Sequence, residues 1–196
     1  MEDELLAFYA GAIEARRLSR GIGQGEFVRT FELLEGVLPQ SAAVIYDAGG
    51  GTGRYASRLA ERGHVVRLLG PVPEHVDTAA REARGLKSMT VGDARALPWP
   101  DAIGDVVLLM GPLYRLLRRE DRVRALREAK RVAKAGGIIF GVIIPRWAST
   151  LIGMLRGWVY EDAYAELVQE EIATGRHRRP KFWSSGVAFP ARGQRG

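Results

Sequence analysis

Along residues 44–144, short apolar segments alternate with longer stretches in which apolar residues recur at helical spacing. The short segments predict strands at residues 44–47, 64–69, 86–91, 105–110 and 138–144, and the longer stretches predict helices at residues 52–62, 74–84 and 119–133. Residues 105–110 are almost continuously apolar, which is typical of a parallel strand buried on both faces.

Strands that alternate with helices of this length indicate βαβ units with right-handed crossovers. The pattern therefore predicts an α/β fold with a doubly wound, mostly parallel, Rossmann-like sheet. Ligands in such sheets bind beyond the carboxyl ends of the strands. We expect the functional site at the turns that follow residues 47, 69, 92 and 110.

An N-terminal segment, residues 1–40, precedes this sheet. Apolar periodicity predicts helices at residues 4–18 and 26–38, and the glycine-rich residues 21–25 are expected to break the chain between them. These helices either pack on the sheet or partly cap the cofactor. Together with the strands they belong to a single domain over residues 1–180.

The segment after the fifth strand does not continue the alternation. Residues 145–175 predict a helical lid, in which the helix at residues 160–174 is acidic on its outer side. The apolar stretch at residues 145–158 is too short and too interrupted by arginine to span a membrane. Residues 181–196 are a basic tail, and the aromatic residues between 182 and 189 supply one late strand at most.

Composition and charge narrow the class of protein. The chain has 196 residues, of which 46% are hydrophobic, which suits one globular domain. Its net charge is +6, but residues 176–196 hold six Lys or Arg and no acid, so the first 175 residues balance at 23 basic and 23 acidic. We interpret the tail as a solvated terminus and expect no nucleic-acid or membrane partner. The acidic N-terminus lacks a secretory signal, which predicts a cytoplasmic protein.

The most informative motif follows the first strand. Asp47 is followed by glycines at positions 49, 50, 51 and 53 and then by the start of a helix. Such a turn leaves the backbone bare enough for a ligand to approach it closely. Arg54 stands where the dinucleotide fingerprint has its last glycine, and the Lys of a phosphate-binding Walker loop is absent. The turn predicts a nucleotide-type cofactor pocket.

Four motifs occur together in a known order and spacing. They are the turn at residues 44–53, Gly92-Asp93-Ala94, the strand at residues 105–110 and the Lys134-Ala135-Gly136-Gly137 entry to the fifth strand. In these the chain resembles the class I S-adenosylmethionine (SAM)-dependent methyltransferases, in particular the bacterial small-molecule type. The resemblance covers about residues 1–180 and implies SAM as the cofactor.

The resemblance also implies roles for the first turn. Asp47 would orient the turn and hydrogen-bond the methionine end of SAM through water. Gly49, Gly51 and Gly53 would let the backbone approach the methionine and ribose parts.

The later turns would hold the rest of the cofactor. Asp93 would accept a hydrogen bond from the adenine amino group, with the Ala94 amide on the ring. Met110 and Gly111 would lie beneath the sulfonium. Gly70 occupies the ribose position at the end of the second strand, where the family has Asp or Glu, and this loss predicts weaker SAM binding. Asp105, at the opposite edge of the sheet, is expected to be structural.

The catalytic residue is unknown from the sequence. His64 and His75 are expected to be structural, and His177 lies in the tail. Arg115 stands where related sequences often have histidine, and arginine is not a base. Without cysteine, and without a cluster of other ligands, no metal site is predicted.

Two functions follow from this pattern. The first is SAM-dependent methyl transfer to a small-molecule acceptor, with Trp147, Leu151 and Leu155 either lining an apolar acceptor pocket or packing in the lid. The second is a catalytically degenerate methyltransferase fold that serves as an auxiliary subunit of a partner protein. The fold is expected to lack the full C-terminal strand pair, so its open sheet edge predicts a homo- or hetero-oligomer. RNA methylation is disfavoured because no target-base motif follows the fourth strand.

Overall fold

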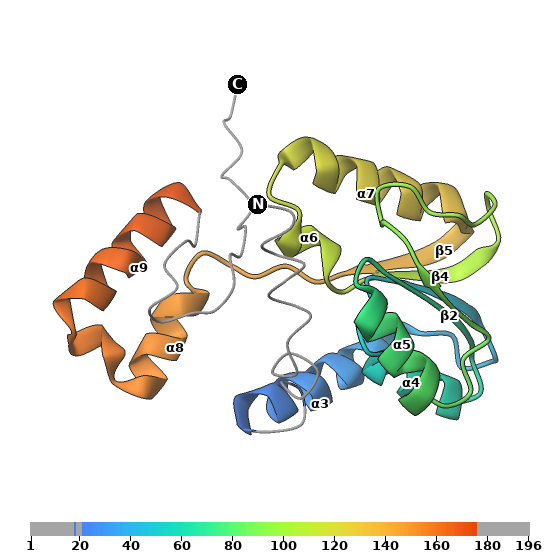
Figure 1. Ribbon diagram of the computed structural model, residues 1–196, viewed down its shortest axis with the longest axis horizontal. Helices are drawn as coiled ribbons and strands as arrows, with labels where there is room; N and C mark the ends of the chain where they lie inside the picture. Colours follow the sequence, from blue (N-terminus) through green and yellow to red (C-terminus); the bar gives the residue numbers. More distant parts are fainter. Residues whose placement is uncertain (1–17, 19–20, 176–196) are drawn as a thin grey trace.

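A five-stranded parallel sheet forms the centre of the chain in the computed structural model, which describes residue 18 and residues 21–175 (Figure 1). The strands are β1 (Val44–Ala48), β2 (Val65–Gly70), β3 (Ser88–Val91), β4 (Gly104–Leu109) and β5 (Ala133–Gly141). They lie in the order β3-β2-β1-β4-β5, and every neighbouring pair is parallel. The predicted Rossmann-like α/β fold is confirmed, and its strand order reverses between β1 and β4.

Helices cover both faces of this sheet. On one face, α3 (Gly21–Val37), α4 (Arg54–Glu61) and α5 (Pro73–Glu82) pack over side chains such as Ile45 and Leu68. On the other face, α6 (Pro112–Arg115) and α7 (Arg119–Val132) pack over side chains such as Tyr46 and Leu109. Adjacent β1 residues thus belong to different clusters, because successive side chains of a strand point to opposite faces.

Strand β4 is buried on both faces, as its apolar sequence predicted. Val106, Val107, Leu108 and Leu109 are all 0% exposed. Full burial of such a side chain stabilises the fold by about 1.5–3 kcal/mol. This central strand therefore anchors the two helical layers.

Two elements begin five residues earlier than the sequence predicted, α3 at Gly21 and β5 at Ala133. Helix α3 runs through the glycines at positions 21–25, where a break was expected, because packing of Phe31 and Leu34 on the sheet stabilises the helix beyond its local propensity. In β5, Gly137 passes so close to β4 that an added Cβ would lie 3.1 Å from the carbonyl oxygen of Gly104.

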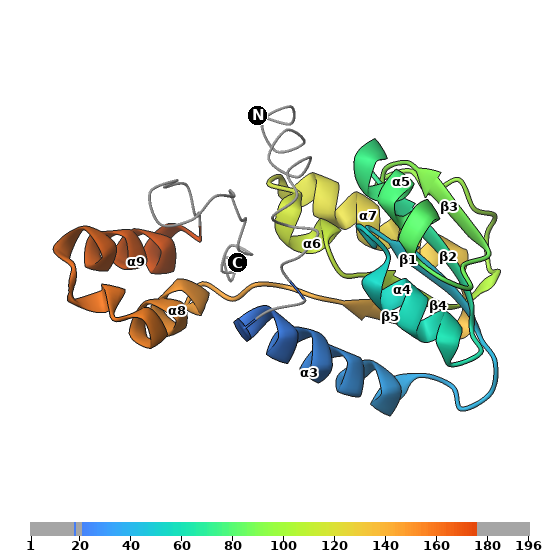
Figure 2. The same ribbon diagram turned by 60° about the horizontal axis from the view of Figure 1, so that its bottom comes forward.

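The segment after β5 forms a helical hairpin of α8 (Ala148–Arg156), the short 3-10 helix η1 (Trp158–Tyr160) and α9 (Asp162–Thr174). Both views show it standing to one side of the sheet (Figure 2). The hydroxyl of the buried Tyr164 donates to the carbonyl of Ser149 at 2.7 Å, which ties the two helices together. Arg146 donates to the carbonyls of Ile172 and Ala173 at 2.9 and 3.2 Å.

The predicted pocket-lining role of the hairpin's apolar residues is wrong for this arrangement. Trp147, Leu151 and Leu155 are 56%, 49% and 72% exposed, and none of them lines the cavity described below. Glu171 also departs from the expected acidic outer face of α9, since it is 1% exposed. The sequence showed the helices but not how they turn relative to the sheet.

Several predictions of the sequence lie outside the described residues. These are the helix at residues 4–18 except for residue 18 itself, His177, the aromatic residues between 182 and 189 and the basic tail at residues 181–196. Within the described residues, no strand lies beyond β5, and no helix is long and apolar enough to cross a membrane.

Asp105 is structural, as its position at the start of β4 predicted. Its Oδ2 accepts a hydrogen bond from the backbone N–H of Val44 at 2.8 Å, and its Oδ1 accepts one from Lys134 Nζ at 2.7 Å. The carboxylate thus joins the starts of β1, β4 and β5, at the edge of the sheet opposite the site. The hydrogen bond from Lys134 holds the pKa of Asp105 below its usual range.

We expect Asp105→Ala to lower the free energy of unfolding by roughly 1–2 kcal/mol, because it removes a charge-assisted contact that is partly open to solvent. Urea denaturation measures this loss. The control is Asp77→Ala, which removes an exposed carboxylate from α5. Equal losses in the two variants would contradict the structural role of Asp105.

Candidate active site

The turn after β1 needs glycine for its backbone conformation. Gly49, Gly51 and Gly53 have φ of 102°, 55° and 79°, a region that side chains strongly disfavour. The N–H of Gly49 donates to the carbonyl of Leu69 at 2.7 Å, which fixes the turn against the end of β2. A Cβ on Gly49 would lie 2.6 Å from Cδ of Pro112, so the turn also packs closely on the start of α6.

Asp47 lies directly beneath this turn. Its side chain is 1% exposed, and neither carboxylate oxygen accepts a hydrogen bond from any described residue. A Cβ on Gly50 would come within 2.7 Å of Cγ of Asp47, so the turn covers the carboxylate without a side chain between them. Burial raises the pKa of Asp47 to about 7. A buried carboxylate of this kind favours a cationic or N–H donor that is not part of the described chain.

A cavity of about 760 Å³ opens beside the turn. Its walls come from the segments that follow β1, β2, β3 and β4, represented by Gly49, Pro71, Asp93 and Gly111. It therefore lies beyond the carboxyl ends of the strands, where the sequence placed the site. Its volume is in the usual range for small-molecule sites.

Asp93 lines this cavity and is held by a neighbouring arginine. Arg95 Nε donates to Oδ1 and Oδ2 of Asp93 at 3.0 and 2.9 Å, and the backbone N–H of Arg95 donates to Oδ1 at 2.7 Å. Nη1 of Arg95 also lies 3.3 Å from Oδ2 of Asp121 on α7. Burial opposes ionisation, but the hydrogen bonds from Arg95 lower the pKa of Asp93 below its usual range. Asp93 is thus a charged group of fixed orientation.

Four of the predicted cofactor residues line the cavity, namely Gly49, Asp93, Ala94 and Gly111. Gly51 lies in the same turn but is not part of the wall. Met110 turns away from the cavity and packs on the core beneath α3, α4 and α5, while its carbonyl accepts a hydrogen bond from the Tyr114 hydroxyl at 2.8 Å.

The end of β2 has no carboxylate in place of the missing family acid. An added Cβ on Gly70 would meet only Cγ2 of Val76, at an ordinary 3.6 Å. Glu74, the acid nearest to Gly70 in the sequence, is exposed on α5 and does not line the cavity. No described acidic side chain therefore replaces the ribose-binding residue from this segment.

Sequence reasoning missed part of the cavity wall. Arg95, Arg118 and Asp121 line it, together with the apolar residues Val72 and Leu117. The spacing of Asp93 and Arg95 was a usable signal, because an acid two residues before a basic residue in a turn readily pairs with it. Nothing in the spacing of Asp121 indicated that α7 would bring it to the same place.

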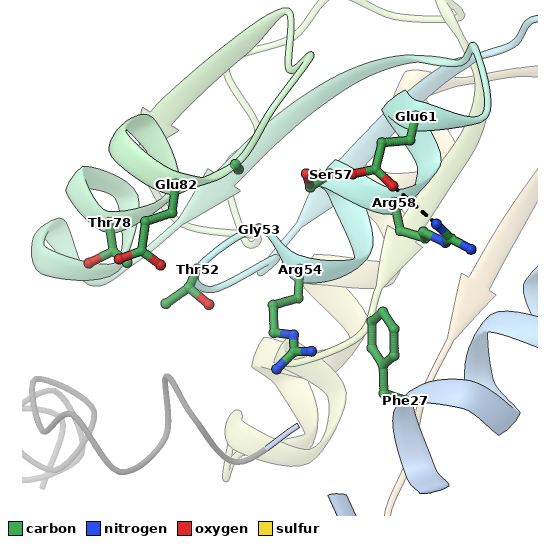
Figure 3. Close-up of a pocket in the computed structure, with 10 residues that line it drawn as sticks. Phe27, Thr52, Gly53, Arg54, Ser57, Arg58, Glu61, Thr78 and Glu82 are labelled. Atoms are coloured by element: carbon green, nitrogen blue, oxygen red, sulfur yellow. Dashed lines mark hydrogen bonds and ion pairs between the residues drawn. The ribbon is translucent and has the colours of Figure 1, made fainter. Parts of the chain in front are cut away.

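A second hollow, of about 410 Å³, lies on the outer side of the glycine turn (Figure 3). Gly53 faces it, between Glu82 of α5 and Arg58 of α4. Several of its polar side chains have partners within the protein: Arg58 contacts Glu61 at 3.2 Å, and Ser57 Oγ accepts a hydrogen bond from the backbone N–H of Arg84 at 3.0 Å. We interpret this hollow as a groove between the packed helices α4 and α5.

The two histidines of the described residues, His64 and His75, are not part of the cavity. Nδ1 of His64 accepts a hydrogen bond from the backbone N–H of Ala43 at 3.2 Å, which confirms a structural role. His75 lies on α5 and does not line the cavity. Among the described residues, no group of three or more potential ligands is arranged to hold a metal ion.

Comparison with known proteins adds sequence relatives. Residues 46–141 match the family model described as a methyltransferase domain. An uncharacterized methyltransferase of Mycobacterium tuberculosis is 34% identical over 106 residues, which are 54% of this chain and 42% of the relative. A ubiquinone/menaquinone biosynthesis C-methyltransferase of Caulobacter sp. is 35% identical in an alignment of 111 positions that covers 50% of this chain and 43% of the relative. The chain spans less than half the length of these curated relatives.

Solved structures show the same fold. A SAM-dependent methyltransferase of Methanosarcina mazei superposes with a TM-score of 0.60 at 23% identity, over 80% of this chain and 76% of that one. The [4+2]-cyclase SpnF superposes with a TM-score of 0.50 at 32% identity, over 57% of this chain and 43% of that one.

The burial of Asp47 leads to a prediction about pH. The pKa of Asp47 is about 7 in the fold against an ordinary 3.8, so the folded state keeps a proton that the unfolded chain releases between these values. Stability should therefore fall as pH rises from about 4 to 7 and then level off, with a total loss of about 4 kcal/mol. Asp47→Asn removes this titration.

Thermal unfolding at pH 4.5 and pH 8 measures the effect. The Tm of Asp47→Asn minus the Tm of the wild type should be higher at pH 8 than at pH 4.5, by on the order of 10 °C. The exposed variant Asp77→Asn is the control and should show no comparable gain. A pH-independent difference between Asp47→Asn and wild type would contradict the burial of a titrating carboxylate.

Proposed function

Because the chain belongs to the class I S-adenosylmethionine-dependent methyltransferases, we propose that it transfers a methyl group from SAM to a small-molecule acceptor. The observation that carries this proposal is the buried carboxylate of Asp47 beneath a glycine turn, beside a cavity of about 760 Å³. SAM, when bound, supplies a methyl group already activated on a cationic sulfur.

The residues present fit this cofactor at two of its three parts. The Asp47 carboxylate, which lacks a donor among the described residues, suits the ammonium of the methionine end, and the bare turn at Gly49 allows close approach. Asp93 and Ala94, at the end of β3, suit the adenine. At the ribose position, Gly70 offers no carboxylate. The contacts at the methionine and adenine ends must therefore supply most of the binding free energy.

Positioning and the exclusion of water are the chain's main contributions to the reaction. Val72, Val91 and Leu116 provide apolar walls. Attack on an activated methyl group needs mainly proximity, alignment and a dry site. Asp93 and Asp121 are both bound to Arg95, so we assign neither as a base. Because no base is assigned in this site, an acceptor atom that loses its proton readily in water suits it.

The small-molecule acceptor is supported by the size of the cavity and by the Caulobacter relative, whose name refers to ubiquinone and menaquinone biosynthesis. The auxiliary-subunit alternative makes a different prediction, namely that the isolated chain binds no cofactor. Binding measurements therefore separate the two functions.

Calorimetric titration of the chain with SAM and S-adenosylhomocysteine (SAH) tests the proposal. We expect micromolar binding that strengthens up to tenfold per pH unit towards pH 7, because a charged Asp47 attracts the ammonium more strongly than a protonated one and the free carboxyl has a pKa of about 7. Binding that appears only with a co-purifying protein would favour the auxiliary subunit. Absence of binding under both conditions would rule out SAM-dependent catalysis.

Gly70 provides a gain-of-function test. The backbone of Gly70 has room for a side chain, and an aspartate there supplies charge-assisted hydrogen bonds of about 2–3 kcal/mol to a ribose. We expect Gly70→Asp to raise SAH affinity at least tenfold. Gly70→Ala is the matched control, since it adds the Cβ without the carboxylate. An unchanged affinity in Gly70→Asp would show that the cofactor does not lie at the end of β2.

A further inference from the structure

Charged side chains divide the walls of the cavity into two regions. The first region consists of Asp93, Arg95 and Asp121, which are joined by the contacts described above. Two carboxylates and one guanidinium give it a formal charge of −1. It lies at the end of β3 and on the adjoining side of α7, where the adenine part of the cofactor is proposed to bind.

The second region is cationic. Arg115 ends α6, and Arg118 lies just before α7; both line the cavity. Together they carry a formal charge of +2. Of the described residues that line the cavity, the only acids are the two that contact Arg95 in the first region.

Arg115 is held over the end of β4. Its guanidinium carbon lies 5.3 Å from the centre of the Tyr114 ring, and the Tyr114 hydroxyl is fixed by its hydrogen bond to the Met110 carbonyl. Nε of Arg115 lies 4.0 Å from the position that a Cβ on Gly111 would occupy. The same Cβ position is 3.1 Å from the carbonyl oxygen of Gly49. The arginine therefore reaches the point where the turns after β1 and β4 meet.

We propose that the methyl acceptor is an organic acid, and that its carboxylate is bound by Arg115 with the support of Arg118. This inference rests on the proposed function and adds the chemical class of the acceptor. A guanidinium carries five donors in a planar fork that matches a carboxylate. Pro112, Leu116 and Leu117 line the same cavity as the two arginines, which suits an apolar or aromatic body attached to that carboxylate.

The anion also explains how a cationic cofactor and a cationic wall share one cavity. A sulfonium and a guanidinium repel each other in an environment of low dielectric constant. An acceptor carboxylate on Arg115 reduces this repulsion, so acceptor and cofactor should bind with positive cooperativity. The competing source of a carboxylate is the methionine end of the cofactor itself, and the experiment is designed to separate the two.

The test compares benzoate with benzamide, which have the same ring and nearly the same planar shape but differ in charge. Their binding to the full chain is measured by NMR titration, with and without saturating SAH, and SAH affinity is measured separately by calorimetry. The variants are Arg115→Met, Arg115→Lys and Arg118→Met. Arg119→Met is the matched control, because Arg119 is exposed on α7 and does not line the cavity.

We expect benzoate to bind the wild type at least tenfold more tightly than benzamide. Arg115→Met should remove this preference and leave benzamide binding and SAH affinity within twofold of wild type. Arg115→Lys should keep part of the preference, Arg118→Met should weaken it by a smaller factor, and Arg119→Met should leave it unchanged.

Two results would overturn the proposal. One is equal binding of benzoate and benzamide to the wild type. The other is a tenfold loss of SAH affinity in Arg115→Met with benzoate binding unchanged, which would assign the arginine to the cofactor's own carboxylate. Failure of the wild type to bind SAM or SAH would instead contradict the proposed function, and the titrations without SAH would still report whether the anion site exists.

Discussion

The burial of one carboxylate at the end of β1 is the constraint on which the site depends. Asp47 lies beneath the glycine turn without a hydrogen-bond donor from the described chain. The packing of the central strands, which are buried over most of their length, offsets this cost in free energy. The turn needs glycine at position 49 both for its left-handed backbone and for its contact with Pro112. Stability and ligand binding therefore compete at the same few residues.

The parallel sheet turns this local feature into a cavity. Because the carboxyl ends of all five strands meet at one edge, the turns after β1, β2, β3 and β4 form walls around the space beside Gly49. The two helical layers then contribute differently. Helix α7 brings the carboxylate of Asp121 to Arg95. Helix α6 brings the guanidinium of Arg115 over the end of β4, so this arginine lies in a different part of the cavity from the two carboxylates.

Much of the fold was predictable from the sequence because its signals are local. The continuous apolar run of β4 and the glycines after Asp47 indicated a buried strand and a ligand-binding turn, and both are present. The errors arose where packing overrides local propensity. Helix α3 continues through a glycine-rich stretch. Trp147 and Leu155, which were expected either to line a pocket or to pack in the lid, are exposed on the hairpin.

The sequence by itself determined the order of strands and helices, the glycine turn with its acid and the absence of an acid at Gly70, because each depends on residues that are neighbours in the chain. Only the tertiary structure decided which side chains face the cavity. The pairing of Asp93 with Asp121 through Arg95 joins residues separated by 28 positions, and Met110 turned out to face the core instead of the ligand. Such contacts depend on how helices lie across a sheet, which residue periodicity does not encode.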